Sequence, residues 1–278
     1  MDKLINFIFP KKENLNNKND NKNDNKRLIE IDFLKGLAVI SMVIFHIPYL
    51  MNMMKMPGPD IYKGILHYMA KFAQITFITM AGVNLGLTYQ IAKSRNNIKE
   101  YHQKQNKRGL QLIIFAIIFT FLSYLSFPNE FVKFGILHFM ATIILLQNYL
   151  VPYKFIQIIV LLLSLYTQKN KDKFKPFFKK NVHPYISFTL GIYNQKYTSM
   201  DYFSIIKWIP FVCTGILYSH IIYKNGQRHK LLDKINIEKY LNKDNKIINC
   251  IASIGKHSLL VYLIHFPIIY FILRLIKK

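Results

Sequence analysis

A lysine and a histidine in the first apolar segment of the chain are its clearest candidates for chemistry. Lys35 stands near the start of this segment, and His46 follows it eleven residues later. Ionisable side chains in a membrane helix cost free energy, so they are functional-site candidates. Eleven helical residues complete three turns plus about 20°, which puts both side chains on one face, roughly 16 Å apart along the axis. That face combines a fixed charge with a titratable base.

Two further histidines, His138 and His265, lie inside later apolar segments. If the first and last helices enter from the inside, His46 and His265 reach a similar depth in the outer half of the membrane, and His138 lies a turn or two below the outer surface. Neutral imidazole is suited to general-base work near pH 7, so we predict that the three histidines line one cavity. A structural hydrogen bond between helices is the alternative, and for His138 and His265 it stays open.

The composition indicates which elements must position these residues. The chain has 278 residues, of which 51% are hydrophobic, and it carries 38 Lys and Arg against 14 Asp and Glu, for a net charge of +24. Runs such as 110–127 are long and almost free of charge, as a membrane helix requires. The cations lie between these runs and not on a surface interleaved with aromatic residues, so a nucleic-acid partner is not expected. We predict an all-α, polytopic membrane helix bundle.

About seven transmembrane helices are predicted, with an eighth as an alternative. The seven are expected at 33–51, 66–91, 109–127, 134–150, 154–167, 203–223 and 249–275. Seven Lys and Arg precede Asp32 and further clusters lie at 93–108 and 224–246, which places the N-terminus and these two loops in the cytoplasm of a multi-pass cell-membrane protein. The six lysines of 169–180 contradict this pattern, because the same count puts them outside. An interfacial amphipathic segment or an eighth span near 182–193 would explain them.

The chain has a simple predicted organisation. Residues 11–27 are low in complexity and almost without apolar side chains, so residues 1–30 are expected to form a disordered, Asn/Lys-rich cytoplasmic tail. Residues 31–278 then form the membrane-embedded domain. No secretory signal is visible, so the first membrane helix is expected to direct insertion. The two cysteines, Cys213 and Cys250, are interpreted as packing residues.

Other polar residues near the membrane surface are secondary candidates. Lys107 and Arg108 open the third helix and could join Lys35 in binding a cytosolic phosphate, although anchoring at the interface is an alternative role for such cations. Asn84 is a candidate polar contact, and Asp201 is an acid beside the sixth helix that could equally be a helix cap. The histidines lack helical i, i+4 spacing and a nearby carboxylate, so no metal is expected.

Small residues in the second helix predict packing. Gly82 and Gly86 are four residues apart, so they lie on the same helix face and allow a neighbouring helix to approach closely. No internal repeat is apparent, which disfavours a transporter built from duplicated halves.

Several of these segments, taken in order, resemble the catalytic-domain family of heparan-alpha-glucosaminide N-acetyltransferase, within the membrane-bound acyltransferases. They are Glu30-Ile-Asp-Phe-Leu-Lys-Gly-Leu-Ala38, the Gly82 segment, Lys107-Arg-Gly109, Phe134-Gly-Ile-Leu-His138, Asp201-Tyr-Phe-Ser-Ile-Ile-Lys-Trp208 and Ile254 to Pro267. Related enzymes carry an arginine, ten residues and an essential histidine in the first helix, where this chain has Lys35 and His46. Ser204 and Lys207 also stand where the family commonly has proline.

The resemblance implies acyl transfer from cytosolic acetyl-CoA, or another acyl-CoA, to a hydroxyl or amine of a sugar or glycan acceptor at the outer face. His46 would be the base or a transient acyl carrier, with His138 and His265 as further catalytic candidates. Lys35, Lys107 and Arg108 would hold CoA. Asn84 or His138 would donate to the developing oxyanion, and Asp201 is a candidate for acceptor binding. Lysine in place of arginine keeps the charge but loses the bidentate fork.

Two other classes of function remain open from the sequence. One is a small membrane permease or lipid or glycan exporter whose histidines relay protons, although the membrane region has almost no Asp or Glu to line a transport path. The other is a catalytically inactive membrane anchor. The acceptor, the acyl chain and the oligomeric state, with a homo-oligomer as one option, are not determined by the sequence.

Overall fold

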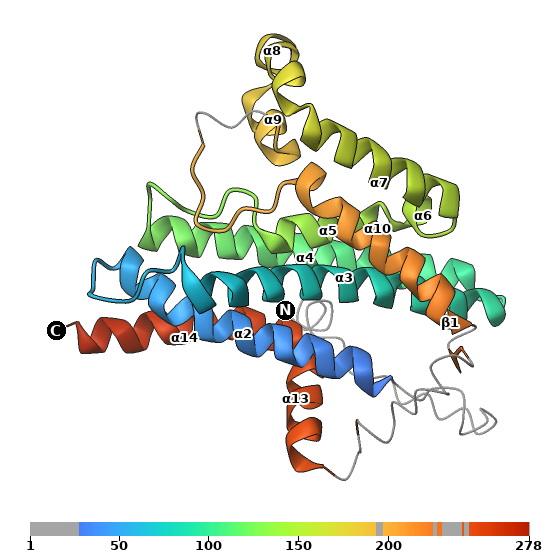
Figure 1. The fold of residues 1–278 in the computed structure, drawn as a ribbon, viewed down its shortest axis with the longest axis horizontal. Helices are drawn as coiled ribbons and strands as arrows, with labels where there is room; N and C mark the ends of the chain where they lie inside the picture. The colour runs from blue at the N-terminus through green and yellow to red at the C-terminus, as the bar shows by residue number, and fades with distance from the viewer. Residues whose placement is uncertain (1–27, 193–196, 225–226, 230–240, 242–244, 278) are drawn as a thin grey trace, which may run out of the picture. The chain divides into compact units, whose positions relative to one another are not determined.

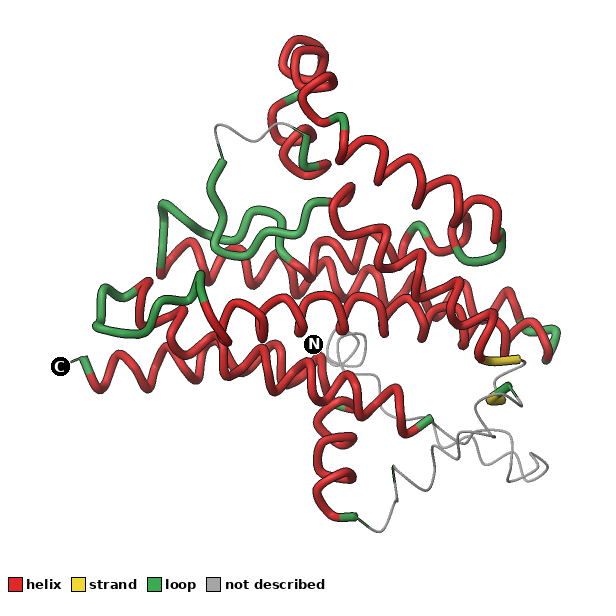
Figure 2. Tube along the Cα trace, in the orientation of Figure 1, coloured by secondary structure: helices red, strands yellow, loops and turns green. Residues whose placement is uncertain are grey.

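The computed structural model describes residues 28–192, 197–224, 227–229, 241 and 245–277. Within these ranges the chain forms eleven helices and one antiparallel pair of two-residue strands, which confirms the predicted all-helical class (Figures 1 and 2). Residues 1–27 lie outside the described residues, and they include the low-complexity stretch 11–27 that was predicted to be disordered.

Five helices are long and apolar enough to cross a membrane. They are α2 (Ile29–Met53), α3 (Gly64–Ser94), α4 (Ile98–Ser126), α10 (Ile205–Ile222) and α14 (Ser258–Ile276). Large apolar side chains on their surfaces are exposed, for example Phe121 on α4 and Phe271 on α14, as expected of helices that face lipid. The five correspond to the first, second, third, sixth and seventh predicted spans, the last in shortened form.

Neither the fourth nor the fifth predicted span is among the helices that are long and apolar enough to cross a membrane. The fourth is divided into α5 (Ile136–Leu145) and α6 (Gln147–Leu150), and the fifth is α7 (Lys154–Lys169), a helix of 16 residues. Gln157 of α7 is fully buried, and its side-chain amide donates to the carbonyl oxygens of Leu150 and Val151 at 3.0 and 2.9 Å. A buried amide thus satisfies backbone acceptors where α6 ends, which stabilises the turn into α7.

No eighth span occurs among the described residues. The lysine-rich segment forms α8 (Lys171–Asn181), and the predicted span near 182–193 is replaced by α9 (Pro184–Leu190). A helix of seven residues extends only about 10 Å, far less than the hydrocarbon core. The prediction of amphipathic helix at 169–180 agrees with α8, which buries none of its residues.

The seventh predicted span is wrong at its N-terminal end. Residues 249–275 form two helices, α13 (Lys246–Lys256) and α14, which run in different directions on either side of His257 (Figure 1). Gly36 of α2 and Gly255 of α13 explain the break. A Cβ at Gly255 would overlap the carbonyl oxygen of Asp32, and one at Gly36 would overlap that of Ile251. Because α13 packs its backbone directly onto α2, it cannot continue the direction of α14.

The chain divides into two compact units, and the division falls inside α3 and α10. Among the described residues, the first unit comprises Thr88–Cys213, and the second comprises residues 28–87 together with those from Thr214 onward. In the second unit, α13 and α14 pack on α2. Its part of α3 meets α10 through glycines: a Cβ at Gly215 would overlap the carbonyl of Thr79, and one at Gly86 would overlap Ser219. The predicted packing role of the Gly82–Gly86 face is therefore confirmed.

The first unit is organised around α4 and α5. Gly109 of α4 lies against Leu145 of α5, where a Cβ would be 2.8 Å from a Leu145 methyl carbon. The loop before α5 pairs with the segment before α10, since Phe203 N–H donates to the carbonyl of Phe134 at 3.0 Å. This pairing brings residue 201 to the start of α5.

Candidate active site

His46 and His265 lie together in the second unit. The centroids of their rings are 4.9 Å apart, and the rings are tilted by 72°, edge to face. His46 comes from α2 and is half-buried, whereas His265 comes from α14 and is buried. Two titratable rings, from helices that are far apart in the sequence, are thus in direct contact. The similar depth predicted for His46 and His265 in the membrane allows this contact.

Hydrogen bonding determines which nitrogen of each ring is available. Nδ1 of His46 lies 2.8 Å from the carbonyl oxygen of Met42, and Nδ1 of His265 lies 2.6 Å from that of Tyr262. A carbonyl oxygen only accepts, so each Nδ1 carries the hydrogen and each neutral ring keeps its lone pair on Nε2. Among the described residues, Nε2 of His265 is buried without a hydrogen-bond partner. The pair therefore offers base nitrogens in a water-poor setting.

Aromatic side chains surround the two histidines. Tyr49 and Phe266 contact the His46 ring at centroid distances of 5.9 and 6.3 Å, and Tyr262 contacts the His265 ring at 5.5 Å. These rings limit the access of water to the imidazoles without supplying a charge. A hydrogen bond to an imidazole is stronger in such surroundings than in water.

A repeated proline was a signal that the sequence prediction did not use. Pro48 follows His46 by two residues in α2, and Pro267 follows His265 by two residues in α14. A proline inside a helix has no N–H, so it leaves the carbonyl four residues earlier without its helical partner. The same His-x-Pro pattern in two membrane helices would have paired His46 with His265.

His138 has a different environment in the first unit. Its Nδ1 lies 3.3 Å from the N–H of Gly135, and its Nε2 lies 3.4 Å from Oγ1 of Thr120. Since the N–H of Gly135 can only donate, Nδ1 accepts and Nε2 carries the hydrogen. Thr120 Oγ1 donates to the carbonyl of Val132 at 2.8 Å, which leaves it free to accept from His138. Both ring nitrogens of His138 are therefore engaged in structural hydrogen bonds.

Comparison with known proteins identifies the family to which the chain with this histidine pair belongs. The profile of the family described as heparan-alpha-glucosaminide N-acetyltransferase, catalytic, matches residues 27–267. The chain belongs to this acetyltransferase family. No curated protein and no solved structure matches it. The match confirms the predicted resemblance, spans the segments that carry His46, His138 and His265, and assigns the chain a membrane acetyltransferase type of function.

In this member of the acetyltransferase family, Lys35 is largely buried beside an acid. Its Nζ lies 3.8 Å from Oδ1 of Asp32, one turn earlier on α2. This separation is longer than a hydrogen bond, so the pair is loose. The backbone carbonyl of Asp32 lies where α2 meets α13, against Gly255. Lys35 is therefore positioned close to the start of the helix that carries His46.

The remaining predicted binding residues are distributed over both units. Lys107 and Arg108 are exposed on α4 of the first unit, and Asn84 is half-buried on α3 of the second unit. Within the described residues, no group of three or more His, Cys, Asp or Glu lies close enough together to hold a metal ion.

Asp201 caps a helix other than the one that follows it in sequence. Its Oδ2 accepts from the N–H of Ile136 at 3.0 Å, at the N-terminus of α5. The same oxygen lies where a Cβ on Gly135 would be, so Gly135 gives the carboxylate room to reach the helix end. Asp201 thus holds the helix that carries His138, and a negative charge there is favourable to the helix dipole.

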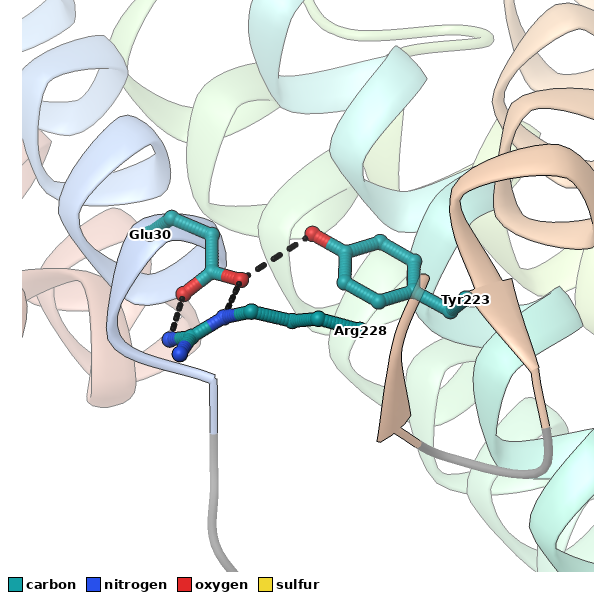
Figure 3. A network of polar contacts seen from close by, with 3 residues as sticks. All are labelled: Glu30, Tyr223 and Arg228. Atoms are coloured by element: carbon teal, nitrogen blue, oxygen red, sulfur yellow. Dashed lines mark hydrogen bonds and ion pairs between the residues drawn. The ribbon is translucent and has the colours of Figure 1, made fainter. Parts of the chain in front are cut away.

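A buried ion pair was missed by the sequence prediction (Figure 3). Arg228 of strand β2 (Gln227–Arg228) donates from Nε and Nη2 to the two oxygens of Glu30, at 2.9 and 2.8 Å. Tyr223 of strand β1 (Tyr223–Lys224) donates to the same carboxylate at 3.3 Å. Burial, together with the Glu30 carboxylate, raises the pKa of Tyr223, so its hydroxyl remains a donor. This bidentate clamp fixes the first turn of α2.

Proposed function

We propose that this protein transfers an acetyl or other acyl group from cytosolic acyl-CoA to a hydroxyl or amine of a sugar or glycan at the outer face. Family membership supports the reaction class. The observation that carries the assignment of the site is the contact of His46 with His265, in which each Nδ1 hydrogen is held by a backbone carbonyl. Two imidazoles that keep Nε2 lone pairs favour a ligand rich in O–H or N–H groups, such as a sugar.

In the proposed reaction, His46 is the general base. Its Nε2 takes the proton of the acceptor hydroxyl or amine as the acceptor atom attacks the thioester carbonyl carbon. The carbon–sulfur bond then breaks, and the CoA thiolate receives the proton back from the imidazolium. Alternatively, Nε2 of His46 attacks the thioester carbonyl carbon and the carbon–sulfur bond breaks to release the CoA thiolate. The acceptor then takes the acyl group from Nε2, and its proton goes to the thiolate. His265 positions the acceptor through a hydrogen bond to its own Nε2.

Cations and amides are proposed to bind the donor. Lys35, Lys107 and Arg108 would hold the CoA phosphates, since the basic loops place these residues at the cytoplasmic side in the predicted topology. Phosphate would compete for Lys35 with Asp32, whose Oδ1 lies 3.8 Å from the ammonium nitrogen. The side-chain amide of Asn84 is proposed to donate to the thioester oxygen as negative charge develops there.

The proposal is tested by thioester turnover of the detergent-purified protein. CoA release from acetyl-CoA is measured with a panel of amino sugars and cell-surface glycan fragments, for the unmodified chain and for His46→Ala. His257→Ala is the matched control, because His257 is exposed and lies outside the pair. We expect acceptor-dependent CoA release that His46→Ala lowers by at least about 100-fold. Equal release by His46→Ala, with an unchanged Tm, would refute the assignment.

A binding measurement separates the enzyme from the other classes. Calorimetry with CoA should give saturable binding that persists in His46→Ala, because the nucleotide end of the donor is bound by other residues. If the protein is a permease or an inactive anchor, no acceptor of the panel should cause release of CoA from acetyl-CoA.

A further inference from the structure

Among the residues that the structure describes, α8 has no packing partner that buries any of its side chains. It has 11 residues, and none of them is buried. Isolated helices of this length are marginal in water and take most of their stability from an apolar face that packs against something. The stabilising surface must therefore lie outside the described part of the chain.

The side chains of α8 show which surface that is. Phe174, Phe177 and Phe178 lie on one side of the helix, and Phe177 is 59% exposed. The other sides carry lysines. They are Lys171, Lys173, Lys175, Lys179 and Lys180. Asp172 is the only acid of the helix, and its carboxylate is already paired with Lys175 at 2.6 Å.

The aromatic side of α8 continues the exposed apolar surface of α7. Phe174 meets Tyr166 of α7 at a centroid distance of 6.3 Å, and Tyr166 is itself exposed beside Leu162 and Leu163. The amide of Gln168 donates to the carbonyl of Ile206 at 2.8 Å, which fixes the end of α7 where the chain turns into α8 (Figure 1). The phenylalanines thus begin where the exposed apolar surface of α7 ends.

We infer that α8 lies in the membrane interface and is a binding surface for anionic phospholipid headgroups. Phenylalanine at the acyl boundary with lysine at headgroup level is the arrangement by which an amphipathic helix binds an anionic bilayer. A soluble polyanion would be attracted by the lysines but gives no role to the three phenylalanines. This inference is independent of acyl transfer.

The test uses the full chain with a reporter in α8. The only native tryptophan, Trp208, is buried, so Phe177→Trp adds an exposed fluorophore. Its signal is obtained by subtracting the fluorescence of the unmodified chain from that of the variant. Its quenching is measured in nanodiscs that contain brominated phosphatidylglycerol or brominated phosphatidylcholine. We expect quenching by both lipids, with a preference for phosphatidylglycerol of roughly tenfold that is weakened by salt.

Two quadruple variants in the reporter background decide the outcome. Replacement of Lys173, Lys175, Lys179 and Lys180 by Gln should abolish the preference, and replacement of the same four by Arg should keep it. All four side chains are exposed, so folding should be unaffected, which Tm checks. Equal affinity for both lipids in the parent, absence of quenching, or a preference that the Gln variant retains would each overturn the inference. So would a fluorescence response to dissolved polyphosphate without a phosphatidylglycerol preference.

Discussion

The α-carbon of Gly255 lies against the carbonyl oxygen of Asp32, at the point where α13 crosses α2. Gly36 makes the reciprocal contact with the carbonyl of Ile251. The two glycines bring the backbones together, and the turn at His257 then sends α14 along α2 so that His265 reaches His46. The contact of the two imidazoles therefore depends on a backbone crossing far from either ring.

Gly255→Ala should destabilise the protein, because the new methyl group overlaps the backbone of α2 and the helices must separate. We expect a loss of about 1–3 kcal/mol, the range for overpacked cores, measured as a fall in Tm in detergent. Gly58→Ala is the matched control, since its Cβ would meet only side-chain atoms of Met51 at 3.6 Å or more. Equal Tm values for the two variants would contradict a tight crossing.

Arg228→Ala should destabilise the protein strongly, because it leaves the Glu30 carboxylate buried without its ionic partner. Loss of one member of a buried ion pair costs about 3–5 kcal/mol, and Arg228→Lys should recover only part of this because lysine lacks the bidentate fork. Thermal unfolding in detergent measures both. The exposed pair Glu100–Lys104 is the control, and Lys104→Ala should leave Tm almost unchanged.

The sequence was sufficient to predict most of the long helices, but it was not sufficient to predict where all of them end. Lipid-facing helices such as α4 are predictable because their apolar runs are long and uninterrupted. The break at His257 was not, because it depends on contacts of Gly255 with a segment over 200 residues earlier in the chain. Small residues in a sequence indicate close packing, but they do not say which helix packs there or in which direction.

The candidate site was predictable to a similar degree. His46 and His265 were expected at one depth, and the structure brings their rings together. Glu30 and Arg228 lie 198 residues apart, so only the fold could pair them. Asp201 was considered as a cap, but the helix it caps, α5, precedes it by 65 residues. Contacts of this kind carry no periodic signal in the sequence.

His265→Gln and His138→Gln should affect acyl transfer differently. In His265 the Nε2 lone pair is unpartnered among the described residues, whereas both nitrogens of His138 are hydrogen bonded. We expect His265→Gln to lower kcat by about 10- to 100-fold and to leave Tm within a few degrees. His138→Gln should lower Tm by loosening the start of α5, and the folded fraction should keep most of its kcat. A large loss of kcat in folded His138→Gln would return this residue to the catalytic group.

Lys35→Met should raise KM for acyl-CoA more than it lowers kcat if the ammonium binds a CoA phosphate. A charge-assisted contact of this kind contributes about 1.5–3 kcal/mol, which corresponds to a roughly 10- to 150-fold change in KM. Lys35→Arg keeps the charge and should restore most of the affinity. Because Lys35→Met removes the cation beside Asp32, the double variant Asp32→Asn/Lys35→Met separates destabilisation from loss of binding. A normal KM in the double variant would exclude Lys35 from donor binding.

Asp201→Asn and Asp201→Ala distinguish a helix cap from an acceptor ligand. The Asn side chain keeps an oxygen that can accept from the N–H of Ile136, so Asp201→Asn should lose only the favourable charge at the end of α5, about 0.3–1 kcal/mol. Asp201→Ala removes the acceptor as well and should cost about 1 kcal/mol more, as a lower Tm. Capping alone predicts an unchanged KM for the acceptor in folded Asp201→Asn, since the backbone of α5 keeps its partner. A rise in that KM without a matching fall in Tm would instead mean that the carboxylate itself contacts the sugar.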